Sequence, residues 1–370
     1  MIDMHVHLRD FEESHKETIG HALFVAASVG YSALFEMPNT SPPLTSRIEI
    51  ERRIAFADQV LFQDRLPVFH GIYAGVTSDV SQVLDMVSCV EELFPRVAGL
   101  KLYAGPSTGN LGVTDPGDQE RVLSELSSVP YGGVLAVHCE DRSCFAEGDG
   151  LSHSQRRPPE AELSSVRQLL DMAERTRFPG TLHICHVTNA EVLDIVEKQR
   201  SRLSCRVSTG VTPHHLLLAE ELESGEGGYL YTVNPPLRSE EIRSKLFQAV
   251  LDGRVDVLES DHAPHELSDK RSGAAGLPGI PGMLCAAAYL VRYGMEGSLL
   301  TRMIFENPMD ILGLEPEMLI SQPSEELPML YRITDMFDQI TSGGWKSLCE
   351  KYRQTVHEYP WDPYRGLFED

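Results

Sequence analysis

Histidines that stand two positions apart, and others that recur along the chain, are the residues most suited to metal chemistry. His5 and His7 lie two apart in an apolar segment, and residues with that spacing on a strand point to the same side. Among fourteen histidines in 370 residues, one such pair carries little weight, because chance also produces it. His138, His186 and Asp261 follow later apolar segments in the same manner. Four imidazoles and a carboxylate that converge would form a divalent metal site, most naturally for Zn²⁺.

Lys101 is an ammonium group within an apolar run, the segment 99–103 (GLKLY). One interpretation is a lysine whose stem is buried while its charge reaches the rim of the fold. The other is a reactive amine, because burial and nearby cations are expected to lower its pKa until the neutral form combines with CO₂ as a carbamate. A carbamate is a bridging carboxylate, and a shared anion stabilises two divalent ions about 3.5 to 4 Å apart.

Several neighbouring residues have more than one interpretation. Asp261 could be a metal ligand, a helix N-cap, or the acceptor of a proton from metal-bound water. Cys185 precedes His186, but no separate base accompanies it, so we expect a buried, inert thiol. We expect His183 to be a core or supporting residue, and His214 with its neighbour either orients the site or is structural.

The elements that must position these residues follow from the alternation of short apolar runs with longer amphipathic segments, which is typical of parallel βα units. Eight strands are predicted, over 2–7, 33–37, 67–74, 99–103, 134–139, 182–187, 203–211 and 255–260. Helices are predicted between them, for example over 47–58, 80–93, 161–174 and 190–199. Eight units predict an α/β fold of the TIM-type (β/α)8 barrel class, in which the residues above lie at the carboxyl ends of strands. No GxGxxG sequence follows the first strand, so a dinucleotide-binding open sheet has no support.

Composition limits the class of protein and its partners. Hydrophobic residues make up 42% of the chain and the net charge is −23, so we expect a globular protein that does not bind nucleic acid. A local group of cations can still hold a small anion. The uncharged segment 273–291 contains four glycines and two prolines and is expected to be a loop and a helix, not a membrane span. Seven cysteines without a CxxC pair, and no secretion signal at the first residues, favour the cytoplasm.

Eight short motifs occur in a definite order along residues 1–312. They are HVHLRD at 5–10, MPNT at 37–40, GLKLY at 99–103, VHCE at 137–140, HICHV at 183–187, TPHH at 212–215, NPPLR at 234–238 and SDHAPH at 260–265. In this order they resemble the dihydroorotases of the amidohydrolase superfamily. The resemblance implies a (β/α)8 barrel with two Zn²⁺ ions. It also implies the reversible cyclisation of N-carbamoyl-L-aspartate to L-dihydroorotate in pyrimidine synthesis, by a zinc-bridged hydroxide.

The resemblance assigns roles to residues of this chain. The implied metal ligands are His5 and His7 for the more buried ion, N6-carboxylated Lys101 as the bridge, His138 and His186 for the more exposed ion, and Asp261 as ligand and general acid/base. The implied substrate residues are Arg9, Asn39 and His265 for the carboxylate, with Asn234 and the backbone from Gly279 to Gly282 for the pyrimidine ring. Arginine suits the carboxylate because its planar guanidinium can bind both oxygens.

The chain also departs from the usual pattern of this family. Its ends lack the segments that form an accessory β-sandwich, so we expect a bare barrel over residues 1–320 and a helix and loop extension over 321–370 that packs on it. Gly210 stands where a glutamate is common, and the segment 283–285 reads MLC where LET is common. Both departures concern the shape of the ring pocket. The segment 105–114, rich in glycine, serine and threonine, is a candidate lid.

Two alternative functions remain. Another cyclic amidohydrolase, such as a hydantoinase, dihydropyrimidinase or allantoinase, is disfavoured by Arg9 and Asn39, because hydantoin and dihydrouracil carry no carboxylate. A catalytically silent barrel that scaffolds aspartate transcarbamoylase is disfavoured by the six ligand positions, all of which are present. The expected partner is a small-molecule substrate, and a homodimer and an association with aspartate transcarbamoylase are both compatible with the resemblance.

Overall fold

Eight parallel strands form the centre of the computed structural model, which describes residues 1–106, 111–319 and 344–368. Each strand is hydrogen-bonded to the next in chain order, from first to eighth. The strands are β1 (Ile2–Val6), β2 (Ala33–Glu36), β3 (Phe69–Gly75), β4 (Val97–Tyr103), β5 (Val134–His138), β6 (Thr181–Ile184), β7 (Arg206–Val211) and β8 (Val257–Leu258). The ring closes where Val6 forms a parallel bridge with His262. The prediction of a TIM-type barrel is therefore confirmed, and every predicted strand overlaps an observed one.

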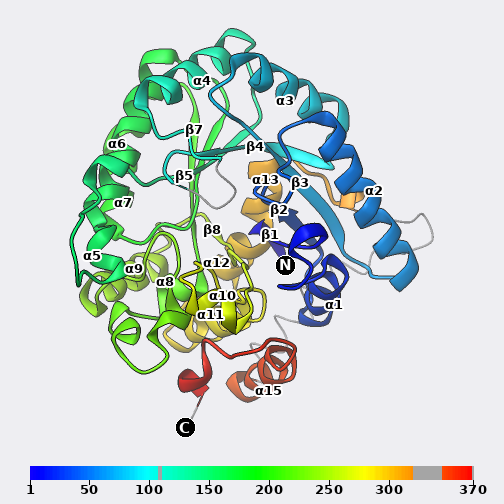
Figure 1. The fold of residues 1–370 in the computed structure, drawn as a ribbon, viewed down its shortest axis with the longest axis vertical. Coiled ribbons are helices and arrows are strands. Elements are labelled where there is room, and N and C mark those ends of the chain that lie inside the picture. Colours follow the sequence, from blue (N-terminus) through cyan, green and yellow to red (C-terminus); the bar gives the residue numbers. More distant parts are fainter. Residues whose placement is uncertain (107–110, 320–343, 369–370) are drawn as a thin grey trace.

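Helices surround the strands, and α3, α4, α6 and α7 follow one another around the outside of the ring (Figure 1). The long helices are α1 (Ile19–Val29), α2 (Arg47–Asp64), α3 (Val80–Leu93), α4 (Pro116–Ser128), α6 (Pro159–Thr176), α7 (Ala190–Gln199), α9 (Glu240–Leu251) and α11 (Gly282–Arg292). Shorter ones are α5 (His153–Arg156), α8 (Pro213–Leu217), α10 (Leu267–Arg271), α12 (Gly297–Thr301) and α13 (Asn307–Leu312). The helix predicted over 47–58 continues to Asp64 because residues 59–64 contain neither glycine nor proline.

Side chains that accept hydrogen bonds from the first turn begin many of these helices. Thr18, Ser46, Asp79, Asp115 and Asn189 each cap the helix that follows. A cap of this kind stabilises a helix by about 1 kcal/mol because it satisfies an otherwise unpaired backbone N–H. The helix starts are thus determined locally. Each loop at the carboxyl ends of the strands runs from the last strand residue to the capping residue of the next helix.

Strand side chains alternate between the helical layer and the barrel interior. On β4, Leu100 and Leu102 belong to the large core beneath the helices, whereas Lys101 between them is fully buried on the interior side. At the opposite end of the barrel from the strand carboxyl ends, α13 contributes Met309 and Ile311 to a second core with residues at the strand starts. Figure 1 shows α13 within the ring of strands. The interior is therefore filled with apolar side chains at one end and open for chemistry at the other.

The last described segment packs on the barrel's outside. Helix α15 (Gly344–Val356) contacts α11 and α1 (Figure 1), and beyond it the Tyr359 ring lies 5.4 Å from the ring of His262. The predicted division at residue 320 falls at the edge of residues 320–343, which lie outside the described part of the chain. All strands within the described ranges belong to the barrel. The division into a barrel and an extension therefore stays a prediction.

The uncharged segment 273–291 is a loop followed by α11, as predicted. Within the ranges that the structure describes, every helix is too short or too polar to cross a membrane.

Candidate metal centre and active site

The carboxyl ends of the strands surround one cavity, and most of the predicted site residues line it. They are His5, His7, Arg9, Asn39, His138, His186, Asn234 and Asp261. The sequence analysis did not single out Tyr103, Pro106, Ala263, Ala275 and Gly276, which line it as well. Lys101, His265, Gly279 and Gly282 are not part of the lining. Eight of the twelve predicted residues therefore share one cavity, although His5 and Asp261 are 256 positions apart, because the βα repeat brings every strand end to the same edge.

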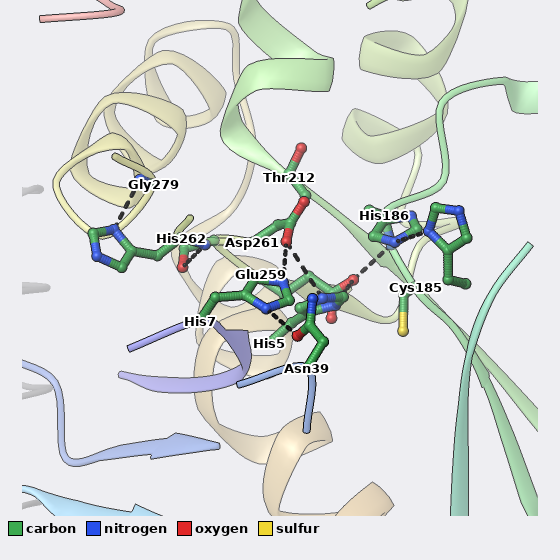
Figure 2. A network of polar contacts seen from close by, with 12 residues as sticks. His5, His7, Asn39, Cys185, His186, Thr212, Glu259, Asp261, His262 and Gly279 are labelled. Carbon is green, nitrogen blue, oxygen red and sulfur yellow. Dashed lines mark hydrogen bonds and ion pairs between the residues drawn. The ribbon is translucent and has the colours of Figure 1, made fainter. Parts of the chain in front are cut away.

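His5, His7 and Asp261 form a compact group of potential metal ligands. Asp261 Oδ1 lies 3.0 Å from His7 Nε2 and 3.3 Å from His5 Nε2, and Figure 2 shows both rings directed at this carboxylate. His7 Nδ1 lies 2.7 Å from Asn39 Oδ1, so an N–H donated to Asn39 leaves Nε2 free for a cation. Burial opposes ionisation of Asp261, but the imidazoles of His5 and His7 outweigh burial and hold the pKa of this carboxyl well below its ordinary value. The group can therefore supply two imidazole nitrogens and one anionic oxygen.

His138 and His186 form a second pair on the other side of the cavity. His138 Nδ1 lies 3.0 Å from His186 Nε2, and His138 Nε2 lies 2.9 Å from Glu140 Oε2. Burial lowers the pKa of both imidazoles, which keeps them in the neutral form that binds metals. His138 Nδ1 therefore faces away from Glu140 and lies beside His186 Nε2, so that both nitrogens could bind the same cation.

Lys101 lies below the cavity rather than on its wall. Its Nζ is 3.1 Å from Cys185 Sγ, and that sulfur lies within 4.8 Å of potential ligand atoms of His5 and Glu259. The Lys101 side chain is therefore inside the barrel beside the histidines, and the interpretation as a rim lysine does not hold, because its exposed fraction is 0%. Burial raises the pKa of the Cys185 thiol to about 12, which agrees with the expected inert thiol.

The backbone turns sharply where the strands end in functional residues. Arg9, His186 and Asp261 have φ angles of 56°, 40° and 44°, a region that residues with a Cβ seldom adopt. Such conformations persist only where surrounding contacts hold them. The strand predicted over 182–187 ends at Ile184 for this reason, because His186 leaves the extended conformation. The turns direct these three side chains toward the cavity.

Arg9 is a cation in the cavity wall with only 4% of its surface exposed. Its Nη2 lies 3.1 Å from His265 Nε2 and its Nε donates to the carbonyl of Pro264 at 3.3 Å. The nearest carboxylate, on Glu13, is 3.9 Å from Nη1. The structure thus places Arg9 beside His265, the two residues predicted to bind a carboxylate together, whereas Asn39 is engaged with His7.

The predicted ring-binding backbone lies elsewhere than the cavity wall. The N–H of Gly279 donates to Nδ1 of His262 at 3.1 Å (Figure 2), and Gly282 faces the ring of Tyr364. The backbone that reaches the cavity is at Ala275 and Gly276, a few residues earlier. The sequence shows a glycine at every third position of this segment, and only the fold decides that Gly276 is the one that lines the cavity.

Two carboxylates that support the site escaped the sequence analysis. Glu259 accepts from the backbone N–H of His186 and from His183. Glu140 accepts from His138 and from the guanidinium of Arg157. Each stands two positions from a predicted ligand on a strand end, and this spacing is the signal that could have identified them.

Comparison with known proteins gives the family. No protein-family model matches the chain. A dihydroorotase of Thermococcus kodakarensis is 35% identical over 280 residues, which are 76% of this chain and 59% of that protein. A dihydroorotase of Methanothermobacter thermautotrophicus is 32% identical over 340 residues, covering 87% of this chain and 71% of that protein. The chain belongs to the dihydroorotase family.

Solved structures with similar folds support the barrel. The L-hydantoinase of Arthrobacter aurescens superposes with a TM-score of 0.73 at 21% identity, over 88% of this chain and 73% of that one. A dihydroorotase of Saccharomyces cerevisiae in complex with 5-fluoroorotic acid gives 0.68 at 18% identity, over 86% and 85%. At these identities the likeness concerns the barrel alone. Because this chain spans only about three fifths of the Thermococcus relative, the activity of a dihydroorotase requires its own argument.

Proposed function

We propose that this chain is a zinc-dependent cyclic amidohydrolase that interconverts N-carbamoyl-L-aspartate and L-dihydroorotate. The observation that carries the proposal is the buried cation Arg9 in the same cavity as the His5, His7 and Asp261 group. Arg9 has no carboxylate at hydrogen-bond distance in the described part of the chain, since Glu13 is 3.9 Å away. A buried guanidinium that lacks a closely matched anion is costly, and both substrates carry a carboxylate that would pair with it. Dihydrouracil and hydantoin would leave the guanidinium unpaired, so the site favours an acidic ring.

The residues present fit a pair of divalent ions. His5, His7 and Asp261 would hold one ion and His138 with His186 the other, with Lys101 as an N6-carboxylated bridge. Support comes from the ligand atoms of His5, His7 and Asp261, which lie within 4.8 Å of one another, and from imidazoles that burial keeps neutral. When bound, two zinc ions would polarise the scissile carbonyl and lower the pKa of a coordinated water to about 7.

Asp261 would move the proton. Burial opposes its ionisation, but the neighbouring imidazoles outweigh burial and hold its pKa well below the ordinary value, so its carboxylate is ionised at neutral pH. In ring opening it would accept the proton of the attacking water and deliver it to the ring nitrogen that leaves. Ring closure uses the same residue in the reverse order, as an acid/base group must by microscopic reversibility.

The remaining side chains of the cavity would hold the substrate. Arg9 with His265 would bind the carboxylate, and Asn39 would both orient His7 and border the same subsite. Asn234, whose Oδ1 lies 2.9 Å from His153 Nε2, would face the ring. Gly279 and Gly282 were also predicted for the ring, and backbone groups at 275–276 are better placed for that role.

The test compares substrates on the zinc-supplemented protein. Ring opening of L-dihydroorotate, dihydrouracil, hydantoin and allantoin is measured at two pH values, with zinc content determined on the same preparation. We expect turnover of dihydroorotate and little turnover of the uncharged rings. Preference for an uncharged ring would replace the proposal by a hydantoinase-type activity. Absence of bound zinc together with no turnover would favour a silent scaffold.

A further inference from the structure

One buried carboxylate, on Glu259, contacts the predicted metal ligands without belonging to them. Its side chain is fully buried. Oε1 accepts the backbone N–H of His186 at 2.6 Å and lies 3.7 Å from His5 Nδ1, and Oε2 lies 3.1 Å from His183 Nε2. Figure 2 shows Glu259 beside His5 and beneath Asp261. One side chain thus connects a ligand from β1 with a ligand from β6.

The contact with His186 acts on the backbone. His186 has a φ of 40°, which only surrounding contacts can hold. A hydrogen bond to an ionised carboxylate is roughly twice as strong as one between neutral groups. The Glu259 bond therefore holds the turn that directs the His186 imidazole toward His138.

The contact with His5 acts on the ring. His5 Nδ1 faces Glu259, while His5 Nε2 lies 3.3 Å from Asp261 Oδ1. A carboxylate beside one ring nitrogen favours the tautomer that carries its proton there and leaves the other nitrogen free to bind a metal. Glu259 and Asp261 therefore face opposite nitrogens of the same ring, with the Glu259 contact an ion-pair approach of 3.7 Å to Nδ1, which has no hydrogen-bond partner among the described residues.

The Glu259 carboxylate fills the space that a side chain at position 210 would occupy if that residue were not glycine. A Cβ placed on Gly210 of β7 would lie 2.3 Å from Glu259 Oε1 and 2.5 Å from Cδ. A glutamate at 210 would carry its own carboxyl carbon two C–C bonds from Cβ, which is about 2.5 Å. The Glu259 carboxylate therefore occupies a volume that is open because residue 210, on the neighbouring strand, is a glycine.

We propose that Glu259 is a positioning residue for the metal centre, which orients His5 and His186. Its carboxylate occupies the volume that a side chain at position 210 would need. The inference rests on the proposed function in one respect, because that proposal assigns the two histidines to metal. Glu259 itself lies outside the proposed ligand set, and its carboxylate and a side chain at position 210 would be alternative occupants of one volume.

The experiment measures zinc affinity of the purified full chain by competition with a chromogenic chelator, together with circular dichroism and melting temperature. The variants are Glu259→Gln, Glu259→Gly, Gly210→Glu and the exchange Gly210→Glu with Glu259→Gly. Glu162→Gln is the matched control, because Glu162 is also a buried carboxyl bonded to a backbone N–H, that of Thr188. Burial raises the pKa of Glu162 to about 7, so part of it is the neutral carboxylic acid near neutral pH. The neutral amide of glutamine resembles this form.

We expect Glu259→Gln to fold and to bind zinc about 10- to 100-fold more weakly, while the control keeps wild-type affinity. Gly210→Glu alone places two carboxylates in one volume and should also weaken binding. The exchange variant should recover affinity relative to Glu259→Gly. Wild-type zinc affinity in Glu259→Gln, or no recovery in the exchange variant, would overturn the proposal. If wild-type protein binds zinc but does not turn over dihydroorotate, the proposed function fails while the zinc comparison still decides the role of Glu259.

Discussion

We expect Glu140 to support the metal centre. Changing it to glutamine should lower both the free energy of unfolding and the affinity for zinc. It is fully buried and accepts from His138 Nε2 and from two nitrogens of Arg157. Burial opposes its ionisation, but these contacts outweigh burial and lower the pKa of Glu140 from 4.5 to about 2. At about 1.4 kcal/mol for each tenfold change in acidity constant, the anion stabilises the fold by about 3 kcal/mol at neutral pH.

A matched control exists on another wall of the barrel. Glu36 accepts from two nitrogens of Arg53 and from His70 Nε2, and its pKa is likewise lowered from 4.5 to about 2, since the contacts with Arg53 and His70 outweigh burial. His70 belongs to no predicted ligand set. Glu36→Gln and Glu140→Gln should therefore lose a similar free energy of unfolding, whereas only Glu140→Gln should weaken zinc binding, by about 10- to 100-fold.

The assay is urea unfolding with a chelator present, so that bound metal does not contribute, and a separate zinc titration. Because the folded pKa of Glu140 is depressed, its stabilisation is complete above about pH 4.5 and is lost as pH falls toward 2. The difference between wild type and Glu140→Gln should thus narrow from about 3 kcal/mol at pH 7 to about 1 kcal/mol at pH 3. Equal zinc affinities of the two variants, or a difference that does not change with pH, would refute the reasoning.

Three further predictions concern the proposed chemistry. Asp261→Asn should lose nearly all turnover and keep zinc, as measured by steady-state rates and metal analysis, and wild-type turnover would rule out Asp261 as the acid/base group. Arg9→Ala should mainly raise KM for dihydroorotate, and an unchanged KM would remove Arg9 from the substrate site. Native mass spectrometry in bicarbonate should show one added CO₂ that Lys101→Gln lacks, and the same mass in both proteins would exclude carboxylation at Lys101.

Much of the architecture could be predicted because its signals are local. Apolar runs of strand length alternate with amphipathic segments, and caps such as Ser46 and Asp79 begin helices within a few residues of where periodicity places them. The strand ends could be located in the same way, so His5, His7, His138, His186 and Asp261 were predicted to converge, and the structure brings them to one cavity. Their roles as ligands still await the zinc measurements.

What the sequence did not reveal depends on contacts between distant residues. Nothing near Asn39 indicates that its carbonyl accepts from His7, and nothing near position 279 indicates that its N–H is used by His262. The first contact arises because the ends of β1 and β2 are neighbours in the barrel, and the second because the chain after β8 folds back beside His262. The strand predicted over 182–187 ends at Ile184 in the structure, because the left-handed φ of His186 ends the extended conformation.

The sequence by itself determined the repeat of eight units, the side of each strand on which polar residues stand, and the family to which the motifs belong. The first two properties follow from short-range periodicity, which the chain displays residue by residue, and the family follows from the resemblance of eight ordered motifs to those of known proteins. Only the tertiary structure decided which carboxylate supports which imidazole, which glycine faces the cavity, and that Gly210 and Glu259 share one volume. Such pairings are set by packing between strands that are dozens of residues apart, and no local pattern encodes them.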